Sequence, residues 1–127
     1  MQVRWFFDYV DARGNNLIAG WLLGLPPKAR ARMERLILRL EAERLPPAHV
    51  MEHLRGARFN VLLALRMDSM NVEYRLIGSK GPGNHQVMLL YGAEERGDVY
   101  VPRTALDTAL VRRTEAMADP AGRLCAH

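Results

Sequence analysis

The chain has 127 residues, 49% of them hydrophobic, which suits a single packed domain, and its one cysteine has no partner for a disulfide bond. No run approaches the roughly 20 apolar residues of a membrane span, and no secretory signal is evident, so we expect a cytoplasmic protein that does not bind membranes. The net charge of +4 is unevenly placed, because segment 28–66 holds nine basic and four acidic residues. This basic segment favours a nucleic acid or an acidic protein as partner.

The first half of the chain predicts one strand followed by two helices. Aromatic and β-branched residues predict the strand over 3–10. Apolar residues at helical spacing predict a first helix capped by Asn15 or Asn16. The second helix, over 26–44, has an apolar stripe formed by Ala29, Met33, Leu36, Ile37 and Leu40. Its other face carries three arginines, which are Arg32, Arg35 and Arg39.

The second half predicts three strands and a closing helix. The strand-like runs are 57–67, 72–79 and 86–93, and the helix covers 101–118. The glycine-rich stretch GSKGPGN joins two strands, so it predicts a hairpin turn and not a phosphate loop, which leads into a helix. We expect Trp21, Leu36, Leu63 and Leu89 in the core. The chain divides into one domain, 1–117, and a flexible C-terminal tail, 118–127.

Six segments, taken in order, resemble the RelE/HigB-type toxins of bacterial type II toxin–antitoxin systems, specifically the phage Gp49-like branch. They are WFFDYV, LPPKARARM, LRGARFNVLLALRM, VEYRLIGS, VMLLYGAEE and VPRTALDTALVRR. The most distinctive marks are LRG at 54–56 before a strand that ends at Arg66, and the pair Tyr74-Arg75 on the next strand. The resemblance implies a small α+β domain of order β-α-α-β-β-β-α, with an antiparallel sheet packed against helices. It also implies cleavage of messenger RNA on the ribosome and inhibition by a cognate antitoxin, commonly a helix-turn-helix protein.

Cleavage of RNA by its own 2′-hydroxyl needs a proton acceptor, a proton donor and positive charge near the phosphorane, but no metal or cofactor. By resemblance, Arg75 matches the family's arginine that stabilises transition-state charge, and Arg66 matches its neighbour on the preceding strand. The full set of predicted catalytic residues is Arg75, Arg66, Arg96 and Tyr100. The predicted RNA-binding residues are Arg32, Arg35, Arg39, Arg55 and Arg58. No metal site is predicted, because His49 and His53 have the spacing of metal ligands but lack a third ligand.

The position of the turn decides which residues face one another on the predicted sheet. A turn around Ser69 and Met70 places Arg66 near Glu73 and puts Arg66 and Arg75 on the face opposite the core. Arg66 and Glu73 then form either a cross-strand ion pair or part of the catalytic site. Both alternatives stay open at this point.

The chain also departs from the family pattern at four positions. It has Leu62 and Ala64 where many ribonuclease members carry basic residues, and Glu94 and Glu95 where they carry a basic pair. No residue stands out as a general base. These departures favour an alternative function. The chain could be a non-catalytic binding protein that inhibits its target, as ParE-type relatives inhibit DNA gyrase, or a phage accessory protein on the same fold.

Overall fold

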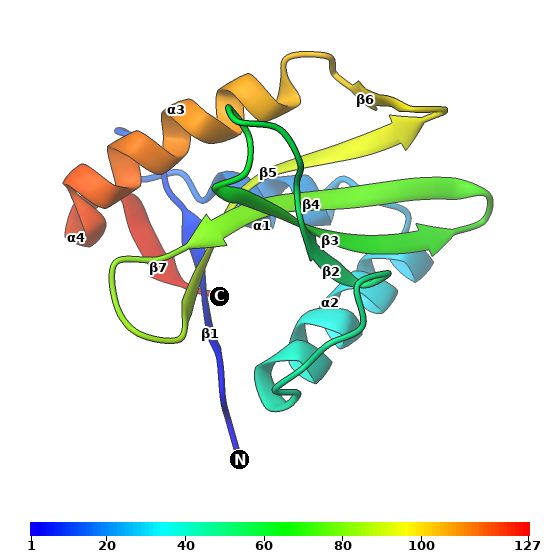
Figure 1. The fold of residues 1–127 in the computed structure, drawn as a ribbon, viewed down its shortest axis with the longest axis horizontal. Coiled ribbons are helices and arrows are strands. Elements are labelled where there is room, and N and C mark those ends of the chain that lie inside the picture. The colour runs from blue at the N-terminus through cyan, green and yellow to red at the C-terminus, as the bar shows by residue number, and fades with distance from the viewer.

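The computed structural model describes residues 1–127 and shows a mixed α+β fold built on a seven-stranded sheet (Figure 1). In chain order the elements are β1 (Trp5–Tyr9), α1 (Leu17–Leu23), α2 (Pro27–Ala42), β2 (Met51–His53), β3 (Leu62–Ser69), β4 (Val72–Lys80), β5 (Gln86–Arg96), β6 (Val99–Val101), α3 (Ala105–Ala118), α4 (Pro120–Arg123) and β7 (Leu124–Ala126). The predicted α+β class is confirmed. None of the helices is both long and apolar enough to cross a bilayer.

The sheet is mixed, which corrects the expectation of an antiparallel sheet. The strands follow the order β2-β3-β4-β5-β1-β7, and β6 pairs with β5. Strand β1 runs parallel to β5, whereas the other neighbouring pairs are antiparallel. Strands β2, β6 and β7 have three residues each, too few for a readable alternation of apolar and polar side chains.

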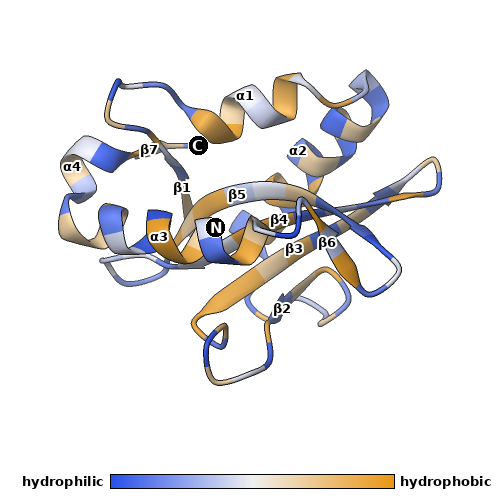
Figure 2. Cartoon of the chain, turned by 90° about the horizontal axis from the view of Figure 1, so that it is seen from above, coloured by the Kyte–Doolittle hydropathy of each residue, from blue (hydrophilic) through white to orange (hydrophobic).

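The helices cover both faces of the sheet (Figure 2). Trp21 of α1 lies against Gly92 of β5, while the guanidinium of Arg112 in α3 lies 4.8 Å from the ring centre of Tyr91, the adjacent residue of β5. Because adjacent strand residues point to opposite faces, α1 and α3 pack on opposite sides. This arrangement explains why central strands β4 and β5 are buried on both faces.

The predicted cap of the first helix and the predicted apolar stripe of the second are confirmed. The side chain of Asn16 caps α1 by accepting hydrogen bonds from the N–H groups of Ile18 and Ala19 at 3.0 and 2.8 Å. Helix α2 begins at Pro27 and buries the predicted stripe of Ala29, Met33, Leu36, Ile37 and Leu40. Of the other expected core residues, Leu63 and Leu89 are buried, and Trp21 packs against the core while partly exposed.

The last ten residues, expected to form a flexible tail, are instead part of the fold. Helix α4 leads into β7, which pairs with β1 in antiparallel fashion, and the N–H of His127 donates to the carbonyl of Phe6 at 3.0 Å. Strand β1 would otherwise be an edge strand with unpaired backbone groups, and β7 satisfies them. The interpretation of residues 118–127 as a loose tail is therefore corrected.

Candidate nucleic-acid interface

The turn between β3 and β4 sets the geometry of the predicted site. Met70 and Asn71 both have positive φ, 51° and 65°, and the two strands pair directly on either side of them. This two-residue turn lies one position later than expected. As a result Arg66 pairs with Arg75 across the strands, which corrects the expected pairing of Arg66 with Glu73.

Arg75 is buried, with 2% of its side chain exposed, although the sequence predicted it on the sheet face opposite the core. Its Nε donates to Glu95 at 2.8 Å, and its Nη1 donates to Asp68 at 3.2 Å and to the carbonyl of Tyr74 at 2.8 Å. Its Nη2 lies 3.6 Å from a carboxylate oxygen of Glu73. Burial alone would lower the pKa of Arg75, but the hydrogen bonds to Glu95 and Asp68 outweigh burial and raise it.

Arg66 and Tyr100 lie in the same cluster. The Nη1 of Arg66 donates to Glu52 of β2 at 3.1 Å. Tyr100 of β6 pairs with Glu95, and its pKa is raised by burial first and by the charge of Glu95 second. The charges of Arg66 and Arg75 oppose that rise. A raised pKa keeps the phenol of Tyr100 protonated at neutral pH, so it cannot act as a general base there, and it also makes Tyr100 a weaker proton donor than an ordinary tyrosine.

We use the name arginine cluster for Arg66, Arg75, Tyr100, Glu52, Asp68, Glu73 and Glu95. Its two guanidinium groups face four carboxylates, so the cluster has a net negative charge. A phosphate would have to displace a carboxylate to reach Arg75. The arrangement therefore holds β2, β3, β4 and β5 together more readily than it offers positive charge to a reacting phosphate.

The side chain of the other predicted catalytic residue, Arg96, forms no ion pair or hydrogen bond with this cluster. It lies at the end of β5 with 70% of its side chain exposed, and it pairs with Glu94 at 3.1 Å. The loop before β3 carries two of the predicted RNA-binding residues. Arg55 is exposed, and Arg58 pairs with Asp107 of α3 at 2.6 Å.

A groove of about 820 Å³ between α2 and the β3–β4 hairpin contains the other three predicted RNA-binding residues. We call it the basic groove, and its charged lining consists of Lys28, Arg32, Arg35, Arg39, Arg66, Arg75, Asp68 and Glu73. Lys28, Arg32 and Arg35 form no ion pair or side-chain hydrogen bond within the chain, whereas Arg39 pairs with Glu43 at 2.6 Å. Arg66 and Arg75 of the arginine cluster contribute to the floor, so the two features adjoin.

Sequence reasoning assigned Glu73 to Arg66 instead of Arg75, and it missed Glu52, Asp68 and Glu95 as ion-pair partners and the part that Lys28 has in the basic groove. One signal for the acidic residues was present. Asn71 tolerates positive φ, so a turn at Met70-Asn71 was a readable alternative, and it aligns Asp68 with Glu73 beside the two arginines. Glu95 and Glu52 come from strands far along the chain, and no local pattern indicates them.

The structure has no group of three or more histidine, cysteine, aspartate or glutamate side chains placed to hold a metal ion. His49 lies in a turn and His53 in β2, so the two do not share a helical face. A scan against protein-family models found no matching family, and searches of curated proteins and of solved structures found no match.

Proposed function

We propose that the chain is a RelE/HigB-type toxin of a type II toxin–antitoxin system and that its basic groove binds messenger RNA on the ribosome. The observation that carries the proposal is the row of cations on α2, three of which have no partner in the chain. Residues 28, 32, 35 and 39 follow helical spacing, so they form one stripe about 17 Å long. A nucleic-acid strand presents several phosphates over such a length.

The proposed activity is cleavage of messenger RNA, and the proposed partner is a cognate antitoxin, commonly a helix-turn-helix protein. An acidic segment of the antitoxin would compete with RNA for the same cations. The support for this proposal is the resemblance in six ordered segments together with the unpaired charge of the basic groove. The cleavage step has weaker support, since three carboxylates surround Arg75 and no general base is evident.

The test is induced expression of the chain in bacteria, with growth measured and messenger-RNA 5′ ends mapped. We expect growth arrest with new 5′ ends from the parent, and loss of both from the double variant Arg32→Gln, Arg35→Gln. The double variant Arg13→Gln, Arg103→Gln is the matched control, because it removes two exposed arginines that line neither groove and belong to no predicted site. Normal growth on expression of the folded parent would contradict the toxin proposal.

One observation favours a second candidate, a non-catalytic inhibitory binding protein on the same scaffold. Three N–H groups of Arg75 already donate to two carboxylates and a main-chain carbonyl, and its Nη2 lies 3.6 Å from a third carboxylate, so acidic side chains occupy the surroundings that a phosphate would need. Growth arrest without new 5′ ends would support this candidate over the ribonuclease. New 5′ ends that persist in a folded Arg75→Gln variant, which lacks the positive charge, would assign the cleavage to other residues.

A further inference from the structure

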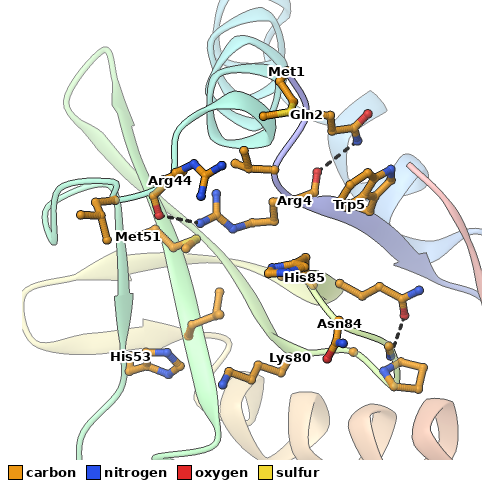
Figure 3. Close-up of a pocket in the computed structure, with 18 residues that line it drawn as sticks. Met1, Gln2, Arg4, Trp5, Arg44, Met51, His53, Lys80, Asn84 and His85 are labelled. Carbon is orange, nitrogen blue, oxygen red and sulfur yellow. Dashed lines mark hydrogen bonds between the residues drawn. The ribbon is translucent and has the colours of Figure 1, made fainter.

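A second groove, of about 980 Å³, lies at the opposite end of the sheet from the β3–β4 hairpin. It is lined by residues 1–5, the loop that follows α2, strand β2 and the turn between β4 and β5 (Figure 3). It shares no residue with the basic groove. We call it the terminal groove.

Its charged lining is entirely basic, because no aspartate or glutamate borders it. Lys80 and Arg44 are exposed and form no ion pair, and the side chain of Lys80 extends toward His53 (Figure 3). Arg44 lies across the groove from them. A third cation, Arg4, is already engaged, since it donates to main-chain carbonyls of Leu40 and Glu43 at the end of α2.

The same groove has an apolar side. The pairing register puts His53, Leu63 and Gly78 in one row across β2, β3 and β4. Side chains in such a row share a face, and Lys80, two residues beyond Gly78, lies on that face. Met51 and Leu63 line the groove beneath the charged residues, and Leu45 at its rim is 90% exposed. Apolar surface beside unpaired cations suits a ligand that is itself part apolar and part anionic.

We infer that the terminal groove binds an organic phosphate of nucleotide type, with its phosphate at Lys80 and His53 and its base against Met51, Leu63 and Leu45. A free nucleotide and the 5′-phosphorylated end of an RNA strand present the same chemistry. Asn84 at the turn has a side-chain amide without a partner in the chain, and it can meet the polar edge of a base. This inference is independent of the proposed function, because the residues of the terminal groove do not belong to the basic groove.

The phosphate dominates the expected recognition. A phosphate dianion binds more tightly when several hydrogen-bond donors converge on it. Lys80 and His53 provide such donors, and no carboxylate in the groove competes for them. The basic groove differs in this respect, because Asp68 and Glu73 line it. A small phosphate ligand should therefore prefer the terminal groove, while a long RNA strand should use the cation row of α2.

The experiment is isothermal titration calorimetry of the full chain with adenosine 5′-monophosphate, adenosine, inorganic phosphate and a trinucleotide with or without a 5′-phosphate. We expect the monophosphate to bind more tightly than adenosine or inorganic phosphate. Lys80→Gln should weaken that binding about tenfold, the loss typical of one charge-assisted hydrogen bond. Arg13→Gln removes an exposed cation that lines neither groove and should leave it unchanged.

Each outcome bears on the inference separately from the proposed function. Preference for the 5′-phosphorylated trinucleotide over the monophosphate would identify an RNA end as the ligand, and the reverse preference would identify a free nucleotide. Equal binding of inorganic phosphate and the monophosphate would overturn the apolar half of the site. Two results would overturn the inference: the folded parent does not bind the monophosphate, or a folded Lys80→Gln variant binds it as tightly as the parent does. Neither result depends on whether the basic groove binds RNA.

Discussion

Arg66 and Arg75 are direct partners across β3 and β4, yet their guanidinium groups turn to different carboxylates, Arg66 to Glu52 at 3.1 Å and Arg75 to Glu95 at 2.8 Å. Two like charges side by side on a sheet repel each other unless each has its own counter-charge. The acidic residues of β2 and β5 supply it from either side. The ion pairs Glu52–Arg66 and Arg75–Glu95 therefore link the four neighbouring strands β2, β3, β4 and β5.

This linkage predicts that Arg75 is a stability residue. Arg75→Ala leaves Asp68, Glu73 and Glu95 close together without their shared cation, so we expect the free energy of unfolding to fall by about 3 kcal/mol. Arg96→Ala is the control, since it removes an exposed pair and should cost less than about 1 kcal/mol. Urea denaturation measures both. An Arg75→Ala protein with the unfolding midpoint of the parent would show that the buried ion pairs contribute nothing net.

The basic groove predicts a salt-dependent affinity for RNA. Removing one phosphate contact from a single-stranded site should reduce the slope of log K against log salt by about 0.7. We therefore expect Arg32→Gln and Arg35→Gln each to weaken binding of an unstructured oligoribonucleotide and to flatten its salt dependence. Arg13→Gln, at an exposed position outside the groove, should change neither. Filter binding over a salt series checks this, and an equal effect from all three variants would point to a diffuse charge effect.

The features that sequence predicted well are those with local causes. Helix α2 follows from its apolar stripe and Pro27, and the β4–β5 hairpin follows from its glycine-rich turn. The register of β3 and β4 was wrong because a turn displaced by one residue changes every cross-strand partner. Burial of Arg75 depends on that register and on Glu95, twenty residues away, so no local pattern reveals it.

Long-range pairings escaped prediction for a related reason. Strand β1 pairs with β5 in parallel and with the C-terminal β7, which lies more than a hundred residues away in sequence. The residues of β7, Leu124–Ala126, have no strand-like alternation, and they are ordered because β1 offers an unpaired edge. In the candidate site, Arg32, Arg35 and Arg39 were predictable as one helix face, whereas their separation from Arg55 and Arg58 depends on tertiary structure.

The contact between Gly92 and Trp21 predicts a strict size limit at one point of the core. A Cβ at residue 92 would lie 1.9 Å from the nearest ring carbon of Trp21, so α1 would have to move away from β5. We expect Gly92→Ala to lower the free energy of unfolding by about 1–3 kcal/mol. Gly20→Ala, an exposed position of α1 with open space around it, should be neutral or stabilising by up to about 1 kcal/mol. Thermal melts of both variants and the parent test this expectation. A Gly92→Ala protein with the melting temperature of the parent would contradict the close contact between Gly92 and Trp21.

His127 ties the C-terminal strand to both β1 and α2. Its Nδ1 lies 2.7 Å from an oxygen of Asp8, and its Nε2 lies 2.9 Å from an oxygen of Glu34. The hydrogen bond to Asp8 is the main cause that raises the pKa of His127 to about 9, against the effect of burial. The imidazolium is therefore the bound form at neutral pH.

The raised pKa predicts a loss of stability at alkaline pH. The folded-state pKa is about 9 and the ordinary value is 6.5, so the contribution of His127 is fully present below pH 6.5 and is lost as pH rises through about 9. The parent should therefore exceed His127→Gln in melting temperature at low pH, and this difference should shrink toward zero above the folded pKa. Other groups titrate in the same range, so the difference between the two proteins at each pH is the quantity to measure. A difference that stays constant across this range would show that His127 stabilises β7 by packing, with no contribution from its charge.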